Sequence, residues 1–299
     1  MKRTVSKRAH PLLPLLAALA GATVTEVSLM AAAPAIFVSS LADADVHLLR
    51  STDSDYSHGW ADGEPAIGFA PVLPFTVAIQ NKSSREVIAY YVTWECTATD
   101  GRVLKHTRDV FNFEKLQPGS RLTPGGIELV ALNVAVEAGR WDDSLSESVL
   151  RLAMMFNSQS MIHISLDAVL FRDGTTAGPN TSHAVERWAA VLEGQAEVID
   201  HATSTVVSAL RPSLLRRAEI GVDLYRRQLQ TGDQPDSGAV AIFLSRSMEV
   251  EAFPSLARAY YALRAVEVID QSGTENFLGQ VKLAQLDKEN FVSVKGLRK

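Results

Sequence analysis

The sequence predicts an α+β protein in which an antiparallel β-sandwich is followed by a C-terminal helical region. Apolar residues first alternate with a period of two between short turns, and then recur with the 3.6-residue period of amphipathic helices. Of the 299 residues, 46% are hydrophobic and 21% are charged, which excludes collagen-like, coiled-coil and wholly disordered chains. The expected organisation is a signal peptide at 1–33, an acidic linker or loop at 34–66, a β-sandwich domain at 67–178 and an α-helical region at 179–299.

The first 33 residues have the pattern of a secretory signal peptide. Basic residues gather in the first eight positions, before a short apolar run at 11–22. Small-residue motifs suited to signal-peptide cleavage lie at 18–20 and 31–33. We therefore expect an exported protein, periplasmic or extracellular, that is soluble after cleavage and has no transmembrane span in the mature chain. An uncleaved anchor, an organelle transit peptide and a first core helix remain open alternatives.

The acidic segment contains the strongest candidate for a metal site. Asp53, Asp55 and Glu64 stand at positions 1, 3 and 12 of an EF-hand-like loop, and Ca²⁺ prefers such oxygen ligands. His58 occupies the position where that loop requires glycine, so an acidic linker is the favoured interpretation. His47 and His58 match no spacing of zinc ligands. We predict no metal-ligating residues and no cofactor.

Alternating apolar residues predict the strands of the sandwich. Turn residues separate these runs, and Asp100-Gly101 is a strong hairpin signal. Residues 137–160 fit either a helix or a strand. The expected strands are 72–80, 87–98, 103–110, 127–136 and 161–171.

One stretch of these strands, FTVAIQNKSSREVIAYYVTWECTATDG at 75–101, resembles the immunoglobulin-like sandwiches of exported bacterial proteins. A strand, an Asn/Ser turn and a second strand with an inward Trp94 carry the resemblance, which implies an immunoglobulin-like fold for the sandwich. Cys96 is the only cysteine, so an internal disulfide is excluded. Its place on the apolar face of the strand predicts a buried, unreactive thiol.

The sequence predicts that the C-terminal region consists of helices separated by helix-breaking residues. We expect Pro212 to end a helix at 183–210, and Thr231-Gly232 to end the next one. Residues 239–251 favour a helix slightly, and the chain after Asn276 is ambiguous. A further helix is expected at 255–271, with Pro254 in its first turn and Gly273 after its end.

No motif of nucleophilic catalysis or phosphate binding is present. The chain lacks Gly-x-Ser-x-Gly, Ser-x-x-Lys and phosphate-loop patterns, and Pro124-Gly125-Gly126 is a turn. His163 is expected on a strand surface. Basic pairs on one predicted helix could bind an anionic partner, but more often such pairs solvate a helix beside nearby acids. A solvated polar face is expected for the residues of the first long helix, which are His183, Glu186, Glu193, Glu197 and His201. The basic pairs are Arg216-Arg217 and Arg226-Arg227, and Glu219 and Asp223 lie within one helical turn of them.

These features favour an exported, non-catalytic binding or structural module of the cell envelope or exterior, whose partner is a protein or an envelope component. The net charge of −5 gives no reason to expect nucleic-acid binding. We predict no catalytic residues, although an enzyme is not excluded because catalytic groups can lie far apart in sequence. Two alternatives stay open: a secreted hydrolase with its site at the sandwich/helix junction, and a Ca²⁺-dependent carbohydrate or protein binder that uses loop 43–64.

Overall fold

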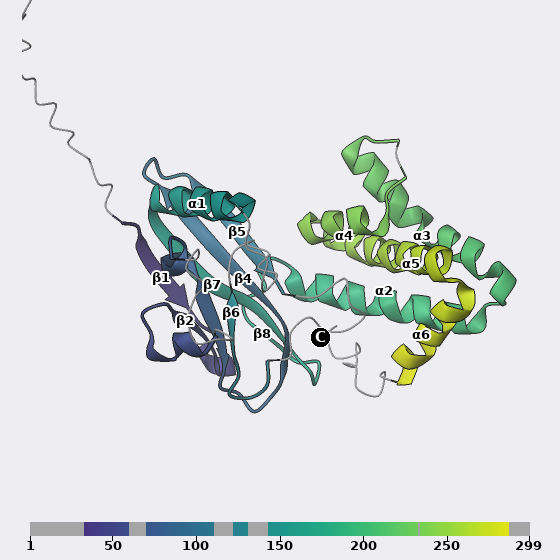
Figure 1. The fold of residues 1–299 in the computed structure, drawn as a ribbon, viewed down its shortest axis with the longest axis horizontal. Helices are drawn as coiled ribbons and strands as arrows, with labels where there is room; N and C mark the ends of the chain where they lie inside the picture. Colours follow the sequence, from purple (N-terminus) through teal and green to yellow (C-terminus); the bar gives the residue numbers. More distant parts are fainter. Residues whose placement is uncertain (1–32, 60–69, 111–121, 131–142, 233, 287–299) are drawn as a thin grey trace, which may run out of the picture. The chain divides into compact units, whose positions relative to one another are not determined.

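The larger of two β-sheets runs through the first half of the described chain (Figure 1). The computed structural model describes residues 33–59, 70–110, 122–130, 143–232 and 234–286. Within them the strand order of this sheet is β1-β7-β4-β5, and β8 also pairs with β7. β1 runs parallel to β7, whereas the other pairs are antiparallel. The strands are β1 (Ala35–Ser39), β4 (Val87–Ala98), β5 (Val103–Asp109), β7 (Gln159–Phe171) and β8 (Thr176–Ala177).

A smaller antiparallel sheet has the order β2-β3-β6. Its strands are β2 (Val46–Arg50), β3 (Val77–Asn81) and β6 (Ile127–Val130). Short 3₁₀ helices precede or follow these strands: η1 (Ala42–Ala44), η2 (Ser54–Gly59) and η4 (Leu73–Phe75). The strand expected at 72–80 therefore begins only at Val77, because Pro74 lies in the first turn of η4.

The expectation of a linker at 34–66 is wrong for the residues that form β1, η1 and β2. Ile36 and Val38 of β1 pack against the sheet core, and Val46 and Leu48 of β2 belong to it. Each strand is five residues long, so its alternation is short beside the surrounding Asp and Ser residues. Burial of these apolar side chains outweighs the loop composition of the segment.

The two sheets share one hydrophobic core. Val77 and Ile79 of the smaller sheet pack with Trp94, Ile162 and Ile164 of the larger one. Trp94 is fully buried, and its indole Nε1 donates a hydrogen bond of 2.9 Å to the carbonyl oxygen of Phe75. The inward Trp94 expected from the sequence is therefore confirmed.

β4 is buried on both of its faces. Tyr90, Val92 and Trp94 face the core between the sheets, whereas Ala89 and Tyr91 belong to the core of the helical half. The predicted bounds of this strand, 87–98, are correct. Two residues at its beginning depart from the predicted alternation: a register shift between Val87 and Ala89 places Ile88 in the helical core and Val87 in the core between the sheets.

The C-terminal half is helical, so the α+β class is confirmed. α5 is central and packs against α2, α3, α4 and α6. Gly221 of α3 lies so close to α5 that a Cβ atom there would be 2.3 Å from the carbonyl oxygen of Ser255. No helix in the described ranges has the length and apolar character that a membrane span needs. The helices are α1 (Asp143–Asn157), which precedes β7, α2 (Ala184–Ser204), α3 (Val207–Leu229), α4 (Ser237–Arg246), η5 (Val250–Ala252), α5 (Phe253–Ser272) and α6 (Thr274–Leu286).

Pro212 does not end a helix, contrary to the expectation. It lies inside α3, and the break between α2 and α3 falls at Thr205 and Val206, whose backbone is extended. The missing N–H of Pro212 removes one hydrogen bond near the beginning of α3, while Leu210 and Leu214 on either side are fully buried. Tertiary packing therefore outweighs the local proline signal.

Candidate functional site

A notch interrupts one edge of the larger sheet. β4 pairs along one side of β7, so β1 and β8 share the other side. β1 pairs with Met161–Ser165, and β8 pairs with Val169 and Leu170. Between these partners, Asp167 forms a bulge, because the residues beside it pair with consecutive residues of β4. The two edge strands therefore leave a break in the edge pairing at Asp167, where the segment after β8 contacts Asp167 instead.

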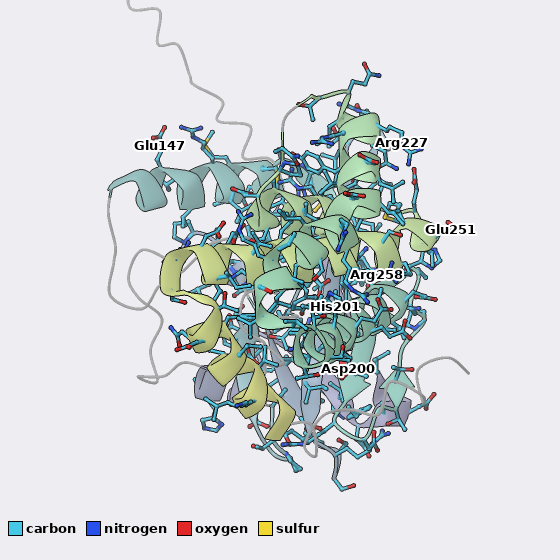
Figure 2. The ribbon with its side chains drawn as sticks, turned by 90° about the vertical axis from the view of Figure 1, so that its right-hand side faces the viewer. Glu147, Asp200, His201, Arg227, Glu251 and Arg258 are labelled. Atoms are coloured by element: carbon cyan, nitrogen blue, oxygen red, sulfur yellow. The ribbon has the colours of Figure 1, made fainter. Side chains whose placement is uncertain are left out.

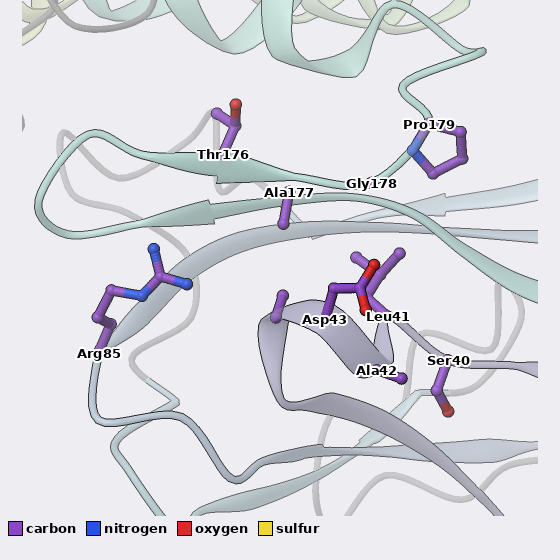
Figure 3. Close-up of a pocket in the computed structure, with 10 residues that line it drawn as sticks. Ser40, Leu41, Ala42, Asp43, Arg85, Thr176, Ala177, Gly178 and Pro179 are labelled. Atoms are coloured by element: carbon purple, nitrogen blue, oxygen red, sulfur yellow. The ribbon is translucent and has the colours of Figure 1, made fainter.

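An open pocket of about 580 Å³ lies at this notch, and we call it the notch pocket (Figure 3). One wall consists of residues 40–44, which follow β1 and include η1. The other wall consists of residues 176–179, which include β8. Arg85 and Asp43 bring opposite charges to the pocket from separate elements, as Figure 3 shows. The pocket therefore assembles three segments that are far apart in the sequence.

Packing holds the cation of the notch pocket in place. The guanidinium of Arg85 lies over the ring of Phe171, 3.7 Å from its centroid, and Nη1 donates a 2.7 Å hydrogen bond to Oγ1 of Thr175. The positive charge of Arg85 also acts on the carboxylate of Asp173. Burial would raise the pKa of Asp173, but hydrogen bonds from Thr175 and the positive charge of Arg85 together hold it below its usual value.

A tight turn at 81–84 contacts both Arg85 and the segment that carries Asp43. The side-chain amide of Asn81 donates to the carbonyl oxygens of Arg85 at 2.7 Å and Leu122 at 2.9 Å. The backbone N–H of Lys82 donates at 2.8 Å to the carbonyl oxygen of Asp45, the residue that ends η1. The positions of Arg85 and of the η1 wall are therefore set by the same turn.

The second wall of the notch pocket includes β8, which pairs with β7 alone among the described strands. Phe171 N–H donates to the carbonyl oxygen of Thr175 at 2.9 Å, so the alternation of an antiparallel ladder directs the N–H and C=O of Thr176 away from β7. Gly178 follows with φ of +108°, and a Cβ atom there would lie 2.4 Å from the carbonyl oxygen of Asp167. Only glycine fits this close approach.

The buried carboxylate of Asp167 anchors the chain beyond that wall. One oxygen accepts from the backbone N–H and hydroxyl of Thr181, and the other accepts from those of Ser182. Burial would raise the pKa of Asp167, but these hydrogen bonds hold it below its usual value. The bulge of β7 thereby fixes the segment that leads from the notch pocket into α2.

A second group of polar side chains joins the sheet to the helices. Arg187, with a side chain only 1% exposed, lies 3.4 Å from an oxygen of Asp109, and the indole of Trp188 donates to the other oxygen at 3.0 Å. Arg187 also donates to the carbonyl oxygens of Ser182 at 3.4 Å and Ser247 at 3.3 Å. These groups bind one another, so they hold α2 against the sheet.

The acidic segment does not gather its candidate ligands within the described residues. Asp53 accepts a 2.7 Å hydrogen bond from the backbone N–H of Arg50, and Asp55 accepts one of 3.4 Å from Gln80. Glu64 lies outside the described residues. Among the residues that the structure describes, no three His, Cys, Asp or Glu side chains form a group that could hold a metal ion.

The polar residues predicted on the first long helix have separate partners. His183 lies 3.9 Å from Glu186, Glu197 pairs with Arg258 of α5, and His201 is 2.8 Å from the hydroxyl of Ser213. Figure 2 labels His201 and Arg258 among the side chains of the helical half. Partial burial, and then the nearby positive charges of α3, lower the pKa of His201.

The remaining candidates lie elsewhere. His163 contacts the hydroxyl of Ser39 at 2.8 Å, and Arg226 lies 3.4 Å from Asp223. Cys96 is buried, and burial raises the pKa of its thiol to about 11.

Local sequence patterns reveal neither the notch pocket nor the junction. Asp167 and Arg187 were not singled out from the sequence; the signal that could have marked them is a charged residue among apolar neighbours, because buried charges need partners.

Comparison with known proteins returns no relative: no protein-family model, curated protein or solved structure matches the chain. The function of the chain is therefore inferred from its own residues and their geometry.

Proposed function

We propose that this protein is an exported, non-catalytic binding module of the cell envelope or exterior, and that the notch pocket is its ligand site. The signal-like residues 1–33 support export. The size of the pocket supports ligand binding, since ligand sites typically enclose about 300–1,000 Å³. The partner is a protein or an envelope component, and the two sheets form an immunoglobulin-like sandwich, for which the inward Trp94 is the support.

One observation carries this proposal: a cation held by contacts that need no ligand lies at one pocket with an exposed carboxylate from a separate element. Arg85 is stacked and hydrogen-bonded, and η1, which carries Asp43, is fixed through Asp45. A preformed site binds with a smaller loss of conformational entropy than a site that must order on binding. The folding contacts of Asp109, Asp167 and Arg187, in contrast, direct their charges toward one another and toward the backbone.

Export is tested by the N-terminal residue and the location of the mature protein. We expect mass spectrometry of fractionated native cells to find a start between residues 21 and 36, in the envelope or secreted fraction. An intact Met1 in the cytosol would overturn this part of the proposal.

The binding role is tested in the same cells with a photo-crosslinking residue at position 176. We expect a discrete adduct of the exported protein. The matched control places the same residue at position 102, on the exposed hairpin that carries the Arg102–Asp100 ion pair. Equal labelling from both positions, or none from position 176, would argue against the notch pocket as the ligand site.

A further inference from the structure

We propose that the notch pocket binds short peptides with free ends, taking the terminal carboxylate on Arg85 and the terminal ammonium on Asp43. This inference rests on the proposed function, because it names the ligand class of the same site. Among the described residues, the notch pocket combines a fixed cation with an exposed anion, and β8, whose outer edge carries unpaired backbone groups, forms part of its wall.

The charges of the notch pocket select a zwitterion. A ligand with only a negative charge would gain Arg85 but meet the carboxylate of Asp43, and a cation would meet the reverse. A ligand that carries both charges places each against its opposite. Asp43 and Arg85 belong to different segments whose backbones one turn holds together, so both charges are at the pocket before any ligand arrives.

Arg85 has the geometry to hold a carboxylate. A guanidinium carries five N–H donors in a planar fork, and a carboxylate can accept two of them side by side. The described contacts assign Nη1 of Arg85 to Thr175, and the stack on Phe171 fixes the plane of the fork. The carboxylate of Asp173 already interacts with the charge of Arg85. This interaction weakens, but does not remove, the attraction of Arg85 for a second carboxylate. We therefore expect affinities in the millimolar range.

The wall formed by β8 favours a peptide over a single amino acid. The N–H and C=O of Thr176 point away from β7, so they can pair with one residue of an extended backbone laid beside β8. A free amino acid has both charges but no peptide group for this pairing. The β8 strand is two residues long, and therefore the segment that it can hold is short.

The test is a titration of the mature protein, followed by NMR, with tetra-alanine that has free ends. We expect saturable binding, weakened about tenfold or more by amidation of the C-terminus and also weakened by acetylation of the N-terminus. Alanine alone should bind more weakly than tetra-alanine. Arg85→Gln should remove the effect of amidation, and Asp43→Asn should remove the effect of acetylation.

Control variants separate the pocket from general charge effects. Arg102→Gln and Asp100→Asn change one cation and one anion of an exposed pair outside the notch pocket, and they should bind the peptide like the original protein. Arg85→Lys keeps the charge but loses the planar fork, so it should bind with an intermediate affinity. Circular dichroism confirms that each variant is folded before it is scored.

Four results would overturn the inference. The first is no saturable shift up to about 10 mM tetra-alanine. The others are an affinity for the doubly capped peptide or for alanine that equals the affinity for tetra-alanine, or an effect of amidation that is unchanged in Arg85→Gln. These results leave the proposed function standing if the protein is exported and the residue at position 176 forms its adduct. Cytosolic protein with an intact Met1 would instead reject export, whatever the titration gives.

Discussion

The carboxylate of Asp109, at the end of β5, accepts a 3.0 Å hydrogen bond from the indole of Trp188 on α2. Its other oxygen faces the guanidinium of Arg187, which also lies 5.1 Å from the ring centroid of Phe253. One carboxylate thus joins the larger sheet to two consecutive residues of the helical half. Both partners are almost completely buried, so the contact is made away from water.

Removal of this carboxylate should destabilise the fold. In Asp109→Asn the buried Arg187 loses its counter-charge, and a broken buried pair typically costs about 3–5 kcal/mol. The free energy of unfolding in urea measures this loss. The control Asp100→Asn breaks an exposed pair with Arg102 and should change the free energy of unfolding far less. Similar losses in the two variants would contradict the role given to Asp109.

Asp167 should make the protein sensitive to acid. Its folded pKa is held below the ordinary value of 3.8, so its hydrogen bonds stabilise the fold above that pH. This contribution is lost as the pH falls through the lower folded pKa. The variant Asp167→Asn should be less stable at neutral pH and should lose less stability between about pH 5 and pH 2 than the original protein.

Urea unfolding at a series of pH values measures that difference. Because other carboxylates also titrate in this range, the comparison is with Asp270→Asn, whose carboxylate pairs with Arg211 at the surface. A stability profile for Asp167→Asn that runs parallel to that of the original protein would refute the assignment.

Gly178 should not accept a side chain. In Gly178→Ala the new Cβ atom would meet the carbonyl oxygen of Asp167 while the residue keeps a positive φ, which costs about 1–3 kcal/mol. Gly279, inside α6, has no atom within 4 Å of a Cβ, so Gly279→Ala should stabilise the protein by about 0.5–1 kcal/mol. Thermal unfolding of the two variants compares them. An unchanged midpoint for Gly178→Ala would show that the wall of the notch pocket can shift.

The single thiol should be unreactive while the protein is folded. Cys96 is buried and its pKa is raised to about 11, so almost no thiolate exists at pH 8. An aromatic disulfide reagent at that pH should label the denatured protein promptly and the native protein only as fast as it unfolds. Rapid stoichiometric labelling of native protein would show that the strand opens locally.

The regular parts of the fold could be predicted because their signals are local. The alternation in β4 fixed its bounds at 87–98, and Gly273 marked the end of α5 through its positive φ. β1 and β2 escaped detection, since five residues of alternation are outweighed by a neighbouring acidic composition. The prediction at Pro212 was wrong for the same reason. Proline lowers the stability of a helix locally, but the burial of Leu210 and Leu214 stabilises this helix by more.

The notch pocket could not be predicted from local patterns. Arg85, Asp43 and the wall at 176–179 become neighbours only because β1 and β8 share one edge of β7. A parallel pair such as β1–β7 leaves no turn signature between its strands. The bulge at Asp167 depends on which residues of β4 and β7 face each other, and this is a property of the pair rather than of either strand.

The pairing of β1 with β7 also determines the order in which parts of the sheet can form during folding. Ala35 aligns with Met161 and Ser39 with Ser165, so the first described strand must wait for residues more than a hundred positions later in the chain. Such long-range closure is slow compared with hairpin formation. A chain that emerges from its N-terminus, at a ribosome or through a membrane pore, carries β1 as an open strand until β7 has followed. The notch pocket, which needs β8 as well, is therefore among the last features of the sheet to form.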